Sequence, residues 1–171
     1  MASAIQASEV ALKDYLDACY KPDRDYVRGE LQQRNLGERE HSEMQLAILL
    51  WFATHSTDWQ VLPLPEIRIQ TGAGNFRIAD IAVVAADAPR ESILRTAPRI
   101  VIEILSPEDR MHRYEERLED YRQMGIPAIW VIDPIARTAW DCSSGDWLRT
   151  EQLIEKSSGI YLAIPELSLP R

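Results

Sequence analysis

Residues 99–133 decide the fold of this chain. They read RIVIEIL (99–105), SPEDRMHRYEERLEDYRQMGIP (106–127) and AIWVID (128–133). The first and third stretches are short and almost continuously apolar, which is typical of strands that are covered on both faces. The charged stretch between them predicts a helix, so the whole segment is interpreted as strand, helix and strand.

The predicted helix has well-marked ends. Ser106 is suited to be its N-cap, Pro107 to be its first residue, and Asp109 is an acidic residue three positions after the cap. Gly125 is the expected C-cap, and Pro127 prevents continuation. Because strand–helix–strand units almost always cross over in the right-handed sense, 99–105 and 128–133 are predicted to be parallel strands of one sheet.

Further strands are predicted on both sides of this unit. Residues 66–70 (EIRIQ) alternate between polar and apolar side chains, 71–75 form a turn by composition, and 76–85 (FRIADIAVVA) form a strand. Residues 137–142 and 160–164 are expected to be further strands of the same sheet.

The N-terminal part predicts two helices and a hairpin. Residues 8–19 form an amphipathic helix with candidate core positions Val10, Leu12, Tyr15, Leu16 and Cys19. Residues 26–34 form a hairpin that turns at Arg28-Gly29, and 38–54 form a helix whose apolar positions are Met44, Ile48, Trp51 and Phe52. The predicted fold class is therefore α/β of the mixed α+β kind, a mixed central sheet flanked by helices and preceded by a helix and a hairpin.

Composition is that of an ordinary globular protein. The 171 residues are 46% hydrophobic and 27% charged, which predicts one domain over 1–171. There are two cysteines in no metal-binding pattern, and no segment has the length of a membrane span, so we expect a cytoplasmic protein with no membrane partner. The net charge of −8 argues against tight, non-specific nucleic-acid binding.

Two carboxylates interrupt the apolar strands. Asp80 lies within 76–85, and Glu103 lies between Ile102 and Ile104. A buried ionised carboxylate is costly unless it is paired, hydrogen-bonded or bound to a metal, so two of them on neighbouring strands indicate a divalent cation with oxygen ligands. The alternatives are a structural network, in which Arg77 or Arg99 pairs with either carboxylate, and solvent exposure of a strand end.

The order of short motifs resembles the Uma-two family of endonucleases, within the PD-(D/E)XK (restriction endonuclease-like) superfamily. The resemblance covers about residues 25 to 141 and rests on the segments 26–30 (YVRGE), 40–42 (EHS), 77–80 (RIAD), 101–107 (VIEILSP), 117–121 (RLEDY) and 125–134 (GIPAIWVIDP). It implies a restriction endonuclease-like core and a magnesium- or manganese-dependent hydrolysis of phosphodiester bonds in DNA.

The resemblance also implies roles for particular residues. Asp80 and Glu103 are the expected metal ligands, with the backbone carbonyl of Ile104 as a further ligand. The lysine that usually follows the Glu by two residues is Leu105 here, and the matching position in the following helix is Arg117. Asp80, Glu103 and Arg117 are thus the candidate catalytic residues, and Ala79 stands where the family pattern has proline.

Other residues are candidates for lining the site. Arg113, Arg117 and Tyr121 are spaced by four and share a helix face, beside a core stripe that includes Tyr114 and Leu118. The alternative for the two arginines is a solvated face paired with Glu116 and Asp120. The family pattern places a histidine near the site, so His41 is a candidate for lining it, with a purely structural role as the alternative. Glu38, one helical turn earlier, is a further candidate.

Three functions remain open at this point. The first is a metal-dependent endonuclease, which commonly acts as a homodimer because two strands must be cut. The second is a catalytically impaired nuclease-fold protein that works as a nucleic-acid-binding or assembly module, because an arginine replaces the lysine and the chain is acidic. The third is a structural oligomer whose carboxylates pair with arginines. The preferred DNA sequence and the biological role do not follow from the residues.

Overall fold

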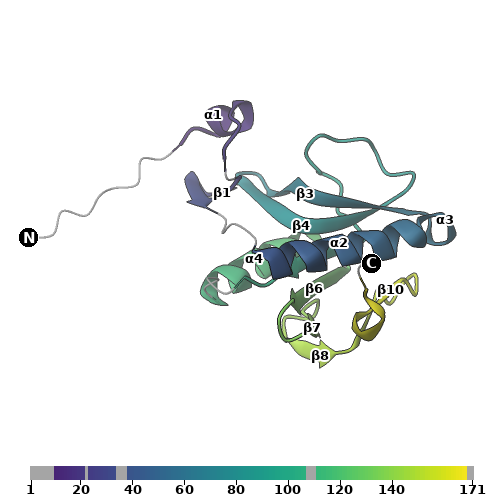
Figure 1. Ribbon diagram of the computed structural model, residues 1–171. Helices are drawn as coiled ribbons and strands as arrows, with labels where there is room; N and C mark the ends of the chain where they lie inside the picture. Colours follow the sequence, from purple (N-terminus) through teal and green to yellow (C-terminus); the bar gives the residue numbers. More distant parts are fainter. Residues whose placement is uncertain (1–9, 22, 34–37, 107–110, 169–171) are drawn as a thin grey trace, which may run out of the picture.

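The computed structural model describes residues 10–21, 23–33, 38–106 and 111–168, with the side chains of 111–113 outside the description. Along the chain lie α1 (Leu12–Asp17), β1 (Arg24–Val27), β2 (Glu30–Gln33), α2 (Arg39–Thr54), α3 (Ser56–Trp59), β3 (Val61–Gly72), β4 (Asn75–Ala85), β5 (Ile100–Ile104), α4 (Met111–Met124), β6 (Ala128–Asp133), β7 (Thr138–Asp141), β8 (Leu148–Thr150), β9 (Gln152–Ile154) and β10 (Tyr161–Ala163), followed by a short 3₁₀ turn (Ile164–Glu166). Figure 1 shows α2 running across the sheet.

The sheet is mixed, and the predicted fold class is confirmed. Among the described residues it has eight strands in the order β2-β1-β4-β5-β6-β7-β8, with β3 paired to β4 as well. β5 and β6 are parallel, with Ile102 opposite Trp130, as the strand–helix–strand pattern predicted, and the other pairs are antiparallel.

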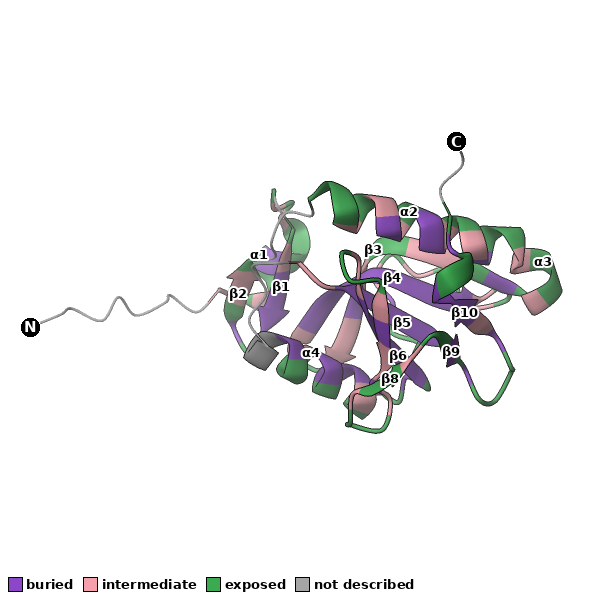
Figure 2. Cartoon of the chain, turned by 60° about the horizontal axis from the view of Figure 1, so that its bottom comes forward, coloured by how far each residue is buried: buried purple, intermediate pink, exposed green. Residues whose placement is uncertain are grey.

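The two faces of the sheet carry separate apolar cores. On one face, α2 packs Met44, Ile48 and Phe52 against alternate residues of β4, β5 and β6. On the other face, α4 packs Leu118 and Tyr121 against the intervening residues of the same strands. In Figure 2 the central strands are accordingly buried between α2 on one side and α4 on the other. The alternation explains why these strands are apolar almost throughout.

The edge of β4 that faces away from β3 is shared by two strands. β1 pairs with β4 at Phe76 and Asn75, whereas β5 pairs with it from Ile81 to Val83. β3 pairs with β4 at Phe76 and at these three residues too, so β1 and β5 must lie on the opposite edge. Residues 77–80 of β4 therefore face the place where β1 and β5 diverge, and this place holds the candidate site.

The N-terminal hairpin agrees with the sequence, and α1 agrees in part. Arg28 and Gly29 both have positive φ (51° and 88°), as a tight hairpin turn requires. α1 is shorter than the predicted 8–19, with Ser8 and Glu9 outside the described residues. Tyr15 is buried, but Cys19 is exposed and Leu16 is 37% exposed, so their assignment to the core was wrong because the helix ends before them or turns them to solvent.

Two other predictions need correction. Residues 160–164 do not join the main sheet, because β10 pairs only with β9 in a separate hairpin that packs Leu162 against the core beneath α2. β3 is also much longer than the predicted 66–70. At α4, Gly125 has a φ of +84°, which confirms the predicted helix end, whereas the predicted start at 107–109 lies outside the described residues. In the described part of the chain, no helix has both the length and the apolar character of a membrane span.

Candidate active site at the divergence of β1 and β5

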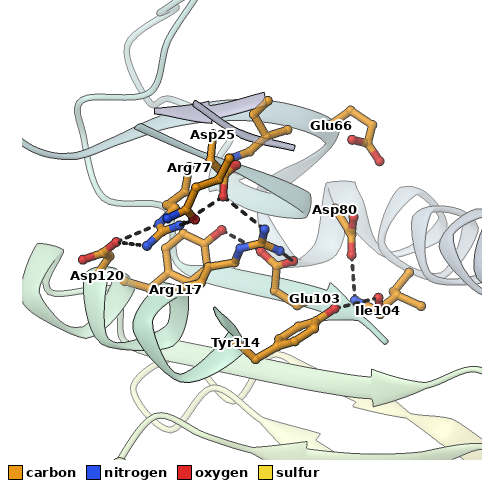
Figure 3. A network of polar contacts seen from close by, with 12 residues as sticks. Asp25, Glu66, Arg77, Asp80, Glu103, Ile104, Tyr114, Arg117 and Asp120 are labelled. Atoms are coloured by element: carbon orange, nitrogen blue, oxygen red, sulfur yellow. Dashed lines mark hydrogen bonds and ion pairs between the residues drawn. The ribbon is translucent and has the colours of Figure 1, made fainter. Parts of the chain in front are cut away.

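Asp80 and Glu103 lie next to each other at the end of the β4–β5 ladder. The last ladder pair joins Ile81 to Ile102, and Asp80 and Glu103 are the next residues of the two strands beyond that pair. Asp80 is 2% exposed and Glu103 is 0% exposed. At this point Oδ2 of Asp80 accepts a hydrogen bond of 2.7 Å from the main-chain N–H of Ile104 (Figure 3). The aspartate thus ties the end of β5 to β4.

α2 reaches Asp80 from one side. Nε2 of His41 lies 3.3 Å from Oδ2 of Asp80. Nε2 of Gln45 donates to the main-chain carbonyl of Asp80 at 2.9 Å and to Oε1 of Glu66 at 3.0 Å. Glu66 lies in β3 with a φ of +48°, a conformation that costs energy for a residue other than glycine. His41 is therefore beside Asp80, and Gln45 and Glu66 join it without having been predicted.

Both carboxylate oxygens of Glu103 accept hydrogen bonds from α4. The Tyr121 hydroxyl donates to Oε1 at 2.6 Å, and Nη1 of Arg117 donates to Oε2 at 2.9 Å. Burial, with the Glu103 charge adding to it, raises the pKa of Tyr121 well above its usual value. Tyr121 consequently remains a neutral hydroxyl donor, and it belongs both to the apolar core and to the candidate site.

Arg117 lies between two carboxylates rather than on a solvated helix face. Besides Glu103, it donates from Nη2 to Oδ2 of Asp25 at 3.1 Å, and its side chain is 16% exposed. Burial alone would lower the pKa of Arg117, but Glu103 and Asp25 raise it well above its usual value. The guanidinium therefore stays charged. The interpretation that pairs this arginine with Asp120 is wrong, because Asp120 binds Arg77.

A second buried arginine continues the network away from Glu103. Arg77 is 1% exposed and contacts Asp120 through Nε and Nη2 at 2.7 and 2.6 Å. Its Nη1 donates to Oδ2 of Asp25 at 3.2 Å and to Oε1 of Gln32 at 3.0 Å. Oδ1 of Asp25 accepts the main-chain N–H of Ile78 at 3.0 Å. Arg77 therefore forms buried ion pairs, as the structural alternative predicted, but its partners are Asp25 and Asp120 and not Asp80 or Glu103.

The carbonyl of Ile104 completes the set of oxygens near the two strand carboxylates. It accepts a hydrogen bond of 3.2 Å from the Tyr114 hydroxyl, and the Arg117 guanidinium lies 5.6 Å from the centre of the Tyr114 ring. Glu38 is exposed at the start of α2, where its carbonyl accepts the N–H of Ser42. The side chain of Arg113 lies outside the described residues.

The charges and oxygens of the site suit a small divalent cation. Among the described residues, three buried carboxylates (Asp25, Glu103 and Asp120) pair with the guanidinium groups of Arg77 and Arg117, and a fourth, Asp80, lies against His41. The four carboxylates and two guanidinium groups together carry two net negative charges when all are ionised. Within that same part of the chain, no group of three or more His, Cys, Asp or Glu side chains is placed to hold a metal. Two carboxylates and a carbonyl fit Mg²⁺, which keeps several waters and takes substrate phosphate as a ligand.

Comparisons with known proteins assign the chain to a family. The family model Uma2, described as "Putative restriction endonuclease", matches residues 12–170. The chain belongs to the Uma2 family. The resemblance seen in the sequence is thereby confirmed. No curated protein matches the chain.

A solved structure has the same fold. It is titled a putative nuclease belonging to DUF820 from Anabaena variabilis, with a TM-score of 0.74 and 21% sequence identity, covering 92% of this chain and 97% of that one. At this identity the likeness shows the fold. Sequence reasoning missed Asp25, Gln45, Glu66 and Asp120 in the candidate site of this Uma2 protein.

Proposed function

We propose that this chain is a metal-dependent endonuclease that hydrolyses phosphodiester bonds in DNA, with Mg²⁺ or Mn²⁺ as its cofactor. The observation that carries the proposal is that Asp80 and Glu103 are both buried just beyond the last pair of the β4–β5 ladder, with the charged Arg117 bound to Glu103. Membership of a family described as restriction endonucleases supports the reaction class.

The oxygens of Asp80, Glu103 and the Ile104 carbonyl would hold the cation. When bound, it acidifies a coordinated water and stabilises negative charge on the phosphate. A carboxylate oxygen has more than one acceptor position, so the bonds that Glu103 accepts from α4 are compatible with this role. The hydrogen bond from Ile104 N–H fixes the orientation of Asp80 before any ligand binds.

Arg117 would bind the phosphate and stabilise its charge in the transition state. An arginine cannot serve as the base in a protein, which restricts it to this electrostatic role. Its Nε–H is buried and has no hydrogen-bond partner among the described residues, and a phosphate oxygen would satisfy it. His41 and Tyr121 would act by orienting Asp80 and Glu103, and Arg113 and Glu38 are proposed only as residues near the substrate path.

The test is cleavage of supercoiled plasmid and single-stranded DNA with Mg²⁺ or Mn²⁺. Asp80→Asn and Glu103→Gln should abolish cleavage and calorimetric Mn²⁺ binding. The exposed residues Asp146 and Glu151 offer matched control variants, Asp146→Asn and Glu151→Gln, which should cleave and bind like the parent. Equal cleavage by Asp80→Asn and the parent would show that the chemistry lies elsewhere.

A catalytically impaired nucleic-acid-binding or assembly module is the second candidate. It is favoured by the ion pair of 2.9 Å that Arg117 makes with a proposed metal ligand, and by the net charge of −8. If the parent protein binds Mn²⁺ without cleaving DNA, Arg117→Lys should be assayed. Cleavage restored by the lysine would identify the arginine as the cause of the impairment.

We also propose that the protein acts as a homodimer, because cutting both strands of a duplex needs two active sites. Light scattering measures the mass in solution. A dimer should linearise plasmid in one encounter, whereas a monomer should accumulate nicked circles first.

A further inference from the structure

The contact between Asp25 and Arg117 joins two parts of the chain that are far apart in sequence. Asp25 comes from β1 and Arg117 from α4, and their side chains meet at 3.1 Å where β1 diverges from β5 (Figure 3). Asp25 is completely buried, so a carboxylate without partners would be strongly unfavourable there. The partners of Asp25 therefore explain why the charge is tolerated.

Asp25 is held from three directions. Its Oδ1 accepts the main-chain N–H of Ile78, and its Oδ2 accepts Nη1 of Arg77 and Nη2 of Arg117. Arg77 is itself fixed by Asp120, which lies on α4 one turn from Arg117. Two of its three partners, the Ile78 N–H and Arg77, contact neither of the proposed carboxylate ligands, so they fix Asp25 independently of a bound cation.

Arg117 makes only one of its two ion pairs with a proposed metal ligand. Nη1 contacts Glu103 and Nη2 contacts Asp25. A cation on Glu103 repels the guanidinium, and Asp25 then becomes the anion that keeps Arg117 in place. Without Asp25 the long, flexible side chain would lose its second anchor.

We infer that Asp25 is the positioning residue that holds the Arg117 guanidinium at the candidate active site. The role in phosphate cleavage rests on the proposed function, whereas the positioning of Arg117 does not. Asp25 acts through Arg117 and touches neither the proposed cation ligands nor the substrate.

The chain offers a matched control for Asp25→Asn. Asp25→Asn and Asp120→Asn each remove one carboxylate from the buried partners of Arg77, but only the first also removes a partner of Arg117. A second pair compares two variants that both lose the partner of Asp120: Asp25→Asn/Arg77→Met, and Arg77→Met alone, which keeps the contact between Asp25 and Arg117. Because the loss at Asp120 is common to both, a difference between them reports on Asp25.

The first measurement is NMR of the arginine side-chain N–H groups in metal-free, ¹⁵N-labelled protein, with the Arg117 signals assigned by their loss in Arg117→Gln. Separate Nη signals should be resolved in the parent, Asp120→Asn and Arg77→Met. In Asp25→Asn and in the double variant, guanidinium rotation should be about tenfold faster or more, as expected on losing one charge-assisted hydrogen bond. Unchanged signals in both variants that lack Asp25, or the same acceleration in Asp120→Asn, would overturn the inference.

The second measurement is a double-mutant cycle on DNA cleavage. Asp25→Asn should lower kcat about tenfold or more in the parent, with little change in KM, and should have no further effect in the Arg117→Gln background. An equal additional loss in that background would mean that Asp25 acts through the fold and would overturn the inference. If the parent does not cleave DNA, the proposed function fails, and the NMR result alone decides the positioning role.

Discussion

The hydroxyl of Tyr121 donates a hydrogen bond of 2.6 Å to Oε1 of Glu103, and both side chains are completely buried. This bond joins α4 to the end of β5 and fixes one proposed ligand oxygen before any cation arrives. Its donor is a neutral phenol whose pKa burial and the glutamate raise.

Tyr121→Phe should lower the free energy of unfolding by about 1.5–3 kcal/mol, because a buried carboxylate loses a hydrogen bond while the ring still fills the core. Urea denaturation measures the difference. Tyr161→Phe is the control: that ring is only half-buried, and the change should stay within about 0.5 kcal/mol. Equal effects of the two substitutions would contradict the importance of the Glu103 contact.

Asp80→Asn should leave the metal-free protein at least as stable as the parent. The amide oxygen can still accept the N–H of Ile104, and one of the five buried carboxylates among the described residues is removed. Asp80→Ala, which leaves that N–H without a partner, should cost about 1–3 kcal/mol.

Adding Mg²⁺ should reverse the order of the parent and Asp80→Asn. At a hundred times the Kd, the parent gains about 2.7 kcal/mol that the variant cannot gain. Thermal denaturation with EDTA and with Mg²⁺ makes the comparison. A variant that is stabilised by Mg²⁺ as much as the parent would exclude Asp80 as a ligand.

Arg77→Met should be the most destabilising of these substitutions, at about 3–5 kcal/mol, because it leaves Asp120 buried without its ion-pair partner. Combining it with Asp120→Asn should recover part of the loss. Arg149→Met, at an exposed position in β8, should change the unfolding free energy little. Urea denaturation of the four proteins tests the network directly.

The two cysteines should differ sharply in reactivity. Cys19 is exposed, whereas burial raises the pKa of Cys142 to about 12, so its reactive thiolate is scarce at neutral pH. A thiol reagent should label one cysteine in the native protein at pH 7.5 and both in urea. Rapid labelling of Cys142 in a Cys19→Ser variant under native conditions would contradict its burial beneath α4.

Stability should fall as the pH rises above about 9. Burial raises the pKa of Tyr15 from 10.0 and that of Cys142 from 9.0, each to about 12. The unfolded chain therefore releases these protons at lower pH than the folded chain does, and each unit of difference corresponds to about 1.4 kcal/mol. Urea denaturation from pH 7 to 11 should show the loss, and Tyr15→Phe/Cys142→Ala should reduce it, with the part due to the raised pKa of Tyr121 remaining. An unchanged slope in that double variant would assign the loss to other groups.

The sequence predicted the helices and strands that pack against an apolar core along their whole length. β4, β5, β6 and α2 have regular apolar patterns because each is covered along its length, and Asp80 and Glu103 stand out within them. Asp25 was missed because β1 is short and begins with charged residues that look like a solvated strand end. Asp120 was missed because helix residues rich in charge usually face water, and only tertiary packing brings this one to Arg77.

β10 shows the same limit for a strand. Its apolar pattern predicted a strand correctly, but the pattern alone does not say which strand is its neighbour. β10 pairs with β9 in a separate hairpin instead of joining the main sheet. Glu66 was also missed, because no feature of the surrounding sequence, which contains prolines and isoleucines, predicts its positive φ in β3.

The divergence of β1 and β5 along one edge of β4 has a consequence for how the chain assembles. From Ile81 to Val84, neighbouring side chains of β4 point alternately toward α2 and α4, so a slip by one residue would exchange the two sets. In such a sheet Asp25 and Asp80 could no longer cap the N–H groups of Ile78 and Ile104, and charged groups would meet aliphatic side chains. The two carboxylates should therefore favour the native strand register during folding, because a shifted register would bury them without hydrogen-bond partners.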